Sequence, residues 1–134
     1  MSAAKMAELH ALVSASPWSE ASFAQQLSQP DTILFEHAKA FALGRAILDE
    51  AELLQIATHP EHQRRGIGRE VLTGFEQCAR TRGCRRLFLE GATSNLAAIS
   101  LYQSAGWQQD GRRKGYYRHA NGQREDALLM SKNL

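Results

Sequence analysis

The chain of 134 residues contains little cysteine and no group of residues with metal-ligand spacing. Its two cysteines, Cys78 and Cys84, match no zinc-binding pattern, because no second pair of Cys or His residues completes one. The five histidines are scattered along the sequence, and we expect them on the surface. These scarcities predict reduced, structural thiols and no metal site.

The sequence also lacks a long apolar run and a strong excess of one charge. No apolar stretch approaches the roughly 18 residues that a membrane span requires, and residues 1–10 have neither the basic start nor the apolar centre of a signal peptide. A net charge of +2 is small for a nucleic-acid-binding domain. Because the length suits one core, we expect a single cytoplasmic domain over residues 1–134, with no membrane and no direct nucleic-acid partner.

The charge is unevenly distributed along the chain. Residues 1–60 carry three Lys or Arg against seven Asp or Glu, and residues 61–134 carry thirteen against seven. The net charge is therefore −4 over residues 1–60 and +6 over residues 61–134. This division suits an anionic cofactor on one side of the molecule and a basic substrate on the other.

Hydrophobic periodicity and turn-forming residues predict four helices and six strands. The helices are expected over about 4–13, 19–27, 67–82 and 95–105, and the strands over about 32–37, 40–48, 52–58, 85–90, 107–117 and 124–132. The order ααβββαβαββ predicts an α+β fold of the α/β-sandwich type, in which helices cover both faces of a mixed sheet.

The segment Gln63–Gly68 stands between an apolar strand and the long helix that follows it. Its two glycines let backbone N–H groups approach a ligand, the helix N-terminus adds partial positive charge, and Arg64 and Arg65 add full charges. This combination predicts a phosphate site, with an arginine-rich helix cap as the alternative. The segment is no P-loop, because Arg69 and Glu70 replace its Lys-Ser/Thr pair, and it lacks the third glycine of a dinucleotide fingerprint.

Two motifs together resemble those of the GNAT superfamily of N-acetyltransferases. Gln63–Gly68 is similar to the acyl-CoA-binding motif Gln/Arg-x-x-Gly-x-Gly/Ala. A second segment follows the pattern Glu-x-x-x-x-Asn-x-x-Ala-x-x-x-Tyr at Glu90, Asn95, Ala98 and Tyr102. Within the superfamily the chain most resembles the RimI-type ribosomal-protein-alanine N-acetyltransferases. The segments that carry this resemblance are Ser16–Glu20, Leu48–Ala51, Ile56–Ala57, Gln63–Gly68, Tyr116–Tyr117 and Arg124–Ala127.

The resemblance implies the GNAT fold, with a mixed and mostly antiparallel sheet flanked by helices. It implies direct transfer of the acetyl group of acetyl-CoA to a primary amine, above all the N-terminal alanine of a small-subunit ribosomal protein, without a metal. Glu90 then resembles the general base and Tyr102 the general acid. A base is needed because an α-amine with a pKa near 8 is largely protonated at neutral pH. A phenol beside the departing CoA sulfur can protonate it.

The cofactor contacts also follow from the resemblance. Main-chain groups of Ile56, Ala57 and Thr58 would lie along the pantetheine arm, and Asn95 would bind that arm near its reactive end. The pyrophosphate would lie against Arg64, Arg65, Gly66, Ile67, Gly68 and Arg69. A helix N-cap is the alternative role for Asn95, and the two roles are compatible.

On the acceptor side, the resemblance implies contacts from Trp18, Tyr116 and Tyr117. Each has a packing alternative: Trp18 as an anchor between two helices, and the tyrosines as part of the last hairpin. The acidic turn 49–52 is either solvated or a contact for a basic peptide.

Two departures from the family pattern stand out. The family begins with a strand before the first helix, whereas about four residues precede it here, so we expect that strand to be missing or to lie upstream. Its loss would leave strand 32–37 at a sheet edge, where pairing with another chain could turn a monomer into a weak dimer. Gly91 replaces the branched residue that follows the base in the family, and a glycine loosens the backbone beside Glu90.

The sequence leaves two alternatives to peptide acetylation. One is acetylation of a small-molecule amine or a lysine side chain. The other is a catalytically weak CoA-binding interaction module, which would bind CoA without turnover. A ping-pong mechanism is not expected, because neither cysteine lies beside the expected position of the thioester.

Overall fold

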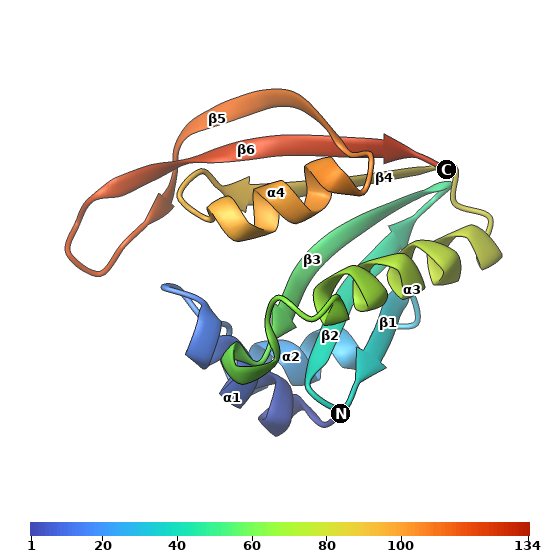
Figure 1. Ribbon diagram of the computed structural model, residues 1–134, viewed down its shortest axis with the longest axis horizontal. Helices are drawn as coiled ribbons and strands as arrows, with labels where there is room; N and C mark the ends of the chain where they lie inside the picture. Colours follow the sequence, from blue (N-terminus) through green and yellow to red (C-terminus); the bar gives the residue numbers. More distant parts are fainter.

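The computed structural model describes residues 1–134 as one mixed sheet with helices on both faces (Figure 1). The helices are α1 (Ala3–Val13), α2 (Glu20–Leu27), α3 (Ile67–Thr81) and α4 (Leu96–Ser104), with a short 3-10 helix η1 (Pro60–His62). The strands are β1 (Thr32–His37), β2 (Ala40–Ile47), β3 (Glu50–Thr58), β4 (Arg86–Ala92), β5 (Gln108–Arg118) and β6 (Arg124–Asn133). The predicted order of helices and strands is confirmed, and only η1 was not expected.

The six strands lie in the order β1-β2-β3-β4-β6-β5. Every neighbouring pair is antiparallel except β3 and β4, which run parallel. That parallel pair is matched at only three positions, from Glu50 with Arg86 to Glu52 with Phe88, and the two strands then diverge (Figure 1). The sheet therefore opens into a V toward the carboxyl ends of β3 and β4. The predicted mixed, mostly antiparallel α+β fold is confirmed.

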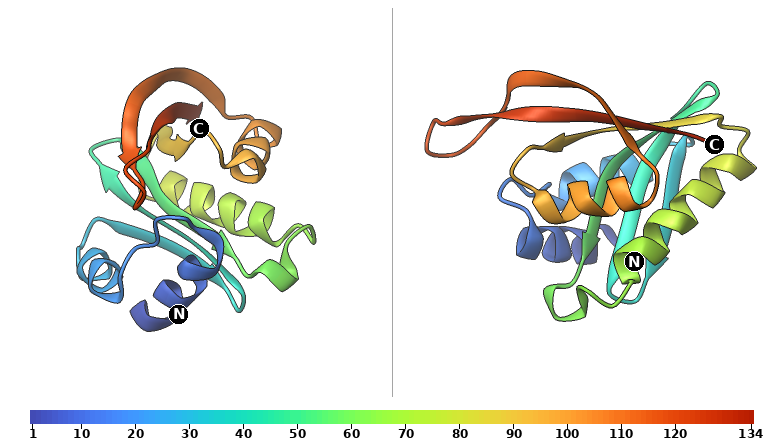
Figure 2. Two further views of the ribbon diagram at one scale, coloured as in Figure 1. Left: turned by 90° about the vertical axis from the view of Figure 1, so that its left-hand side faces the viewer. Right: turned by 45° about the horizontal axis from the view of Figure 1, so that its top comes forward.

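The helices form a layer on each face of the sheet (Figure 2). α3 packs on β1, β2 and β3, and its predicted apolar stripe of Val71, Leu72, Phe75 and Ala79 is fully buried. Gly44 on β2 makes room for this helix, because a Cβ there would lie 2.5 Å from the ring of Phe75. α1 and α2 cover the opposite face through a second apolar cluster. No helix is both long and apolar enough to cross a membrane.

β1 is an edge strand, as expected from the sequence. It pairs with β2 from Thr32 to His37 and has no neighbour on its other side. The amino group of Met1 forms an ion pair with Glu36 of this strand. The start of α1 therefore lies beside the edge.

His10 contradicts the expectation that all five histidines lie on the surface. Its side chain on α1 is buried, and Nδ1 accepts a hydrogen bond of 2.9 Å from the backbone N–H of Trp18. The ring also meets Phe23 edge-on at 5.6 Å. Burial lowers the pKa of His10, so the imidazole is held neutral. Both cysteines are free, as expected, and burial raises the pKa of the Cys84 thiol.

A buried carboxylate ties α3 to the last strand. Glu76 is 6% exposed. Its Oε1 accepts a hydrogen bond of 2.6 Å from Lys132 Nζ, and its Oε2 accepts one of 3.2 Å from Trp107 Nε1. Lys132 also donates to the carbonyl of Ala105 at 2.8 Å. The charge on Glu76 is thus fully compensated.

Candidate active site

The segment between β3 and α3 has the backbone of an anion site. Gly66 is the N-cap of α3 in the left-handed conformation (φ 78°), and the first intrahelical bond runs from the Glu70 N–H to its carbonyl at 3.0 Å. The amides ahead of Glu70 therefore have no helical acceptor. Arg64 and Arg65 are exposed in the same turn. We call residues 63–69 the phosphate loop.

The phosphate loop is fastened to the end of β3 and to α4. Gln63 Nε2 donates to the carbonyl of Thr58 at 3.2 Å. A Cβ on Gly68 would lie 3.4 Å from Thr58 Oγ1 and 3.5 Å from the side chain of Leu101 on α4. Arg69 Nη1 donates to Ser104 Oγ at 3.2 Å, also on α4. The structure thus places the phosphate loop beside the helix that carries Tyr102.

β3 presents an unpaired edge to the V. Ile56, Ala57 and Thr58 pair on one side with β2, opposite Ala42, Phe41 and Ala40, and no strand lies on their other side. Since main-chain groups point alternately to either side of a strand, some of them face the V. An extended ligand that carries amides could pair with them as an added strand would.

Glu90 lies on β4, across the V from β3. Its backbone pairs with Leu129 of β6, and its carbonyl accepts a hydrogen bond of 3.2 Å from the hydroxyl of Tyr117. The side chain is one-quarter exposed, and Oε1 accepts a hydrogen bond of 2.8 Å from Arg113 Nη1. The carboxylate is therefore fixed at its backbone and reachable at its tip.

Tyr102 is buried on α4, with its ring 5.6 Å from that of Trp107. Burial raises the pKa of Tyr102, and the nearby Tyr117 phenol adds to the shift. Burial, followed by the charge of Glu90, raises the pKa of Tyr117 to about 12. Both phenols therefore keep their protons at neutral pH and can donate hydrogen bonds.

Asn95 is the N-cap of α4, because its Oδ1 accepts a hydrogen bond of 3.3 Å from the Ala98 N–H. The turn just before it is held by Glu125 of β6, whose Oε2 accepts from the Ser94 N–H at 2.6 Å and from Thr93 Oγ1 at 3.2 Å. Hydrogen bonding, first from Ser94, lowers the pKa of Glu125 to about 2. The predicted N-cap is confirmed, and its contact with a cofactor stays a prediction.

The residues expected on the acceptor side are not all gathered at the V. Tyr117 contacts Glu90, and Tyr116 stands next to it with 46% of its surface exposed. Trp18 is half-buried against Phe23, with ring centroids 5.2 Å apart, which supports the anchor interpretation. Its role as a substrate contact stays a prediction.

The acidic turn 49–52 lies at the closed end of the V. Glu50 pairs with Arg86 at 2.7 Å, and Glu52 pairs with Arg45 at 2.9 Å. These pairs form where β3 begins, whereas Glu90 follows the start of β4 by several residues. The carboxylates are thus already partnered by arginines, which favours the solvated turn over a contact with a basic peptide.

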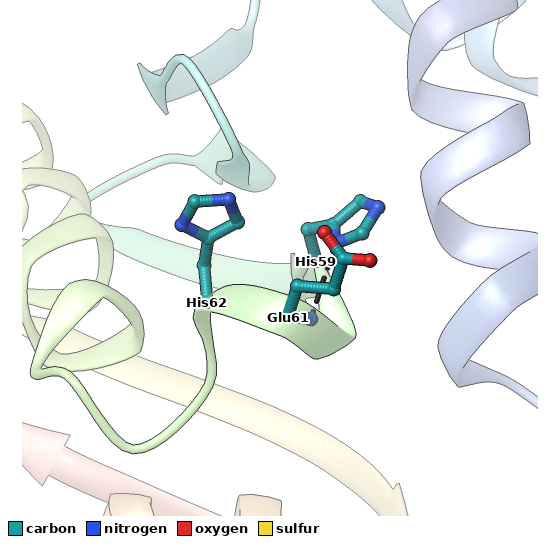
Figure 3. Close-up of side chains that lie close together, drawn as sticks. All are labelled: His59, Glu61 and His62. Carbon is teal, nitrogen blue, oxygen red and sulfur yellow. Dashed lines mark hydrogen bonds between the residues drawn. The ribbon is translucent and has the colours of Figure 1, made fainter.

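Two histidines lie at the ends of η1, just before the phosphate loop (Figure 3): His59 is its N-cap and His62 its last residue, with ring centroids 5.7 Å apart. The ligand atoms of His59, Glu61 and His62 lie within 4.8 Å of one another. The Nδ1 lone pair of His59, however, accepts a hydrogen bond of 3.2 Å from the Glu61 N–H. A neutral His59 therefore carries its proton on Nε2, and a metal would have to displace this hydrogen bond. Both side chains are partly exposed, as expected for surface histidines, and the absence of a metal site stays a prediction.

Three residues that hold Glu90 or the segments around it were not predicted as site residues from the sequence. Arg113 holds the carboxylate, Glu125 holds the turn before α4, and Asp126 Oδ1 accepts a hydrogen bond of 2.9 Å from the Gly115 N–H. The charge excess in the second half of the chain, with its basic run 112–114, was the only signal for Arg113. This charge excess gives no sign that Arg113 pairs with Glu90.

Comparison with known proteins places the chain in a family. The model of the acetyltransferase (GNAT) family matches residues 7–107. The ribosomal protein bS18-alanine N-acetyltransferase of Escherichia coli (strain K12) is 40% identical to the chain over 119 residues, which cover 86% of this chain and 80% of that protein. N-alpha-acetyltransferase RimI of Mycobacterium tuberculosis (strain ATCC 25618 / H37Rv) is 36% identical over 142 residues, which cover 98% and 86% respectively.

A solved structure agrees with these relatives. The crystal structure of the ribosomal-protein-S18-alanine N-acetyltransferase from Escherichia coli matches with a TM-score of 0.84 at 36% identity, over 98% of this chain and 85% of that one. The family match covers well over half of the chain and includes the phosphate loop, Glu90 and Tyr102. The chain therefore belongs to the acetyltransferase (GNAT) family and is an acetyl-CoA-dependent N-acetyltransferase.

Proposed function

We propose that the chain acetylates the N-terminal alanine of a small-subunit ribosomal protein. Relatives that share 40% and 36% identity with it are named for acetylation of ribosomal protein bS18 alanine and for N-alpha-acetylation. The structural observation that supports this proposal is the V between β3 and β4. Glu90 lies on one of its walls, and the phosphate loop follows the end of the other, just after η1.

Acetyl-CoA would extend from the phosphate loop into the V. The amides before Glu70 supply N–H donors for the pyrophosphate, and Arg64, Arg65 and Arg69 supply charge. The unpaired edge of β3 from Ile56 to Thr58 offers main-chain groups to the amides of the pantetheine arm. Asn95 uses its side-chain oxygen as the cap of α4, so its NH₂ group remains available to that arm.

Glu90 would act as the general base. A peptide α-amine with a pKa near 8 must lose a proton before it can attack a thioester at neutral pH. A carboxylate within hydrogen-bond reach, or one water away, typically contributes ~10² to 10⁴ in rate. The pairing of Glu90 with Leu129 and the hydrogen bond from Tyr117 hold this carboxylate on a rigid strand.

Tyr102 would act as the general acid. Glu90 first takes the ammonium proton and releases it to water. The neutral amine nitrogen then attacks the thioester carbon, the carbon–sulfur bond breaks, and Tyr102 gives a proton to sulfur. The second nitrogen proton leaves through Glu90, and water returns a proton to Tyr102. The raised pKa of Tyr102 keeps the phenol protonated until the thiolate develops beside it. No covalent enzyme intermediate is needed, which agrees with cysteines that lie in α3 and just before β4.

On the acceptor side we propose Tyr116, Tyr117 and Trp18 as contacts for the peptide N-terminus. A ribosomal protein substrate would place the reaction in the cytoplasm, without direct contact to nucleic acid. With β1 as the open edge of the sheet, we expect a monomer or a weak dimer.

The test is release of free CoA thiol from acetyl-CoA with a short basic peptide that begins with alanine. Glu90→Gln should lower kcat by roughly a hundredfold or more, whereas Glu8→Gln, an exposed carboxylate on α1, should not. Tyr102→Phe should lower kcat while acetyl-CoA still binds.

Three outcomes would contradict the proposal. Turnover of a small amine or a lysine side chain, but of no peptide N-terminus, would assign a different acceptor. Binding of acetyl-CoA without turnover of any amine would indicate a CoA-binding module. An unchanged kcat in Glu90→Gln would remove that residue from the mechanism.

A further inference from the structure

The proposed base is already bound to a cation of the same chain. Arg113 Nη1 lies 2.8 Å from Glu90 Oε1, within the range of a charge-assisted hydrogen bond. The amine that Glu90 must deprotonate is also a cation before it reacts, since its pKa is near 8. The guanidinium and the acceptor ammonium therefore have the same partner.

An irregularity in β5 brings Arg113 to Glu90. Arg113 pairs with Ala127, but Tyr117 pairs with Glu125, so four steps along β5 match two along β6. Gly115 in this bulge has a φ of 60°, a conformation that favours glycine. Bulges of this kind re-aim side chains near active sites. Here both Arg113 and Tyr117 contact Glu90.

Arg113 has a second partner that does not depend on Glu90. Its guanidinium carbon lies 4.1 Å from the centre of the Tyr116 ring, a cation–π distance. Half of the Arg113 side chain is exposed, so the guanidinium can move toward water without disturbing the core. The Arg113–Glu90 pair is therefore exchangeable, unlike the buried pair of Glu76 and Lys132.

We propose that Arg113 is a displaceable counter-ion, which competes with the acceptor ammonium for Glu90 and so sets how tightly the chain holds a charged N-terminus. When the ammonium takes Oε1, the guanidinium keeps its contact with Tyr116. Charge is balanced at each stage, because one cation replaces another on a single carboxylate. An acceptor amine that is less often protonated would gain less affinity from replacing Arg113 at Glu90.

This inference rests on the proposed peptide acceptor, so its test measures binding rather than turnover. Titration calorimetry with saturating CoA, which cannot react, gives the Kd of the alanine-starting peptide. Arg113→Gln should lower this Kd roughly two- to fivefold, the range that an exposed ion pair supports. Arg113→Lys keeps the charge and should restore the Kd to within twofold of the original.

Two controls separate competition at Glu90 from a general change in charge. Arg112→Gln removes the same charge one residue away, from a guanidinium that pairs with Asp126 at 3.5 Å, and should leave the Kd unchanged. The N-acetylated peptide carries no ammonium, so its Kd should not respond to Arg113→Gln. At a pH well above 8, the free amine becomes neutral and the gain should shrink.

The possible failures are distinguishable. If no peptide binds to the original chain with CoA, the proposed acceptor is wrong. If the peptide binds but Arg113→Gln leaves its Kd unchanged, or changes it as much as Arg112→Gln does, the competition is refuted. If turnover shows a loss in kcat with no change in KM or Kd, Arg113 orients Glu90 instead of competing for it.

Discussion

Gly91 follows the proposed base Glu90 in β4, and the structure has room for a side chain at this position. It lies in β4 opposite Leu128 of β6, and its φ is not positive, so an L-residue fits the backbone. A Cβ there would meet only Leu89 Cδ1, at an ordinary contact distance of 3.7 Å. We therefore expect Gly91→Val to stabilise the fold.

The expected gain follows from strand energetics. A glycine inside a strand costs about 0.5–1 kcal/mol relative to alanine, and a β-branched residue adds a few tenths more on a pleated surface. A total of about 1 kcal/mol should raise Tm by roughly 3–5 °C for a chain of this length. A stiffer backbone beside Glu90 should also raise kcat. The gain should be about twofold to tenfold, which corresponds to holding one side chain in one rotamer.

Gly44→Val is the matched control, because it makes the same change in another strand. A Cβ at Gly44 would lie 2.1 Å from the carbonyl oxygen of Glu52 and 2.5 Å from the ring of Phe75. Backbone cannot move away cheaply, so this variant should lose about 3 kcal/mol or more. Thermal melts followed by circular dichroism, with kcat measured on the same samples, provide the comparison. If Gly91→Val melts below the original chain, the space inferred beside Glu90 does not exist.

The remaining predictions concern three other positions. A Cβ at Gly66 would meet no atom within 4 Å, but the φ of 78° disfavours alanine, so Gly66→Ala should lower the stability of the fold by about 1–2 kcal/mol. Calorimetry should show that this variant raises the Kd for CoA roughly five- to thirtyfold. The control Gly122→Ala, with φ 85° in the last hairpin, should lower stability by a similar amount without changing that Kd. Glu76→Ala removes the acceptor of Trp107 and leaves Lys132 with only the carbonyl of Ala105. This variant should lower the urea-unfolding free energy by about 2–4 kcal/mol, against less than about 0.5 kcal/mol for the exposed Gln77→Ala. Because the pKa of Glu125 is lowered from 4.5 to about 2, its contribution to stability is complete above pH 4.5 and is lost as pH falls toward 2. Glu125→Gln should therefore lower Tm at pH 7 and make no difference near pH 2; a constant difference across that range would contradict this.

The sequence predicted the elements because each one carries a local signal. The stripe from Val71 to Ala79 repeats at helical spacing, and the same residues fill the core against Gly44. The edge position of β1 was expected from the family pattern and is confirmed. His10 was misplaced although a signal existed, since Met6 and Leu9 share its buried face of α1.

The geometry of the V could not be read from local signals. Leu53 and Leu89 continue two apolar strands in sequence, but β3 and β4 stop pairing after Glu52 and Phe88. Where two strands separate depends on what packs on each of them, here α3 on β3 and the hairpin of β5 and β6 on β4. Such contacts join residues far apart in the chain, and periodicity carries no information about them.

The same reasoning explains why Glu90 could be proposed as the base from the sequence, whereas its contact with Arg113 could not be predicted. Glu90 stands at a fixed spacing from Asn95 and Tyr102, because strand, turn and helix are consecutive and their lengths set the spacing. Arg113 reaches Glu90 through the pairing of β4 with β6 and of β6 with β5, and then through a bulge that shifts the register. A single inserted residue in β5 would turn its side chain to the other face of the sheet. The register of β5 on β6, rather than spacing along the chain, therefore decides which side chain reaches Glu90.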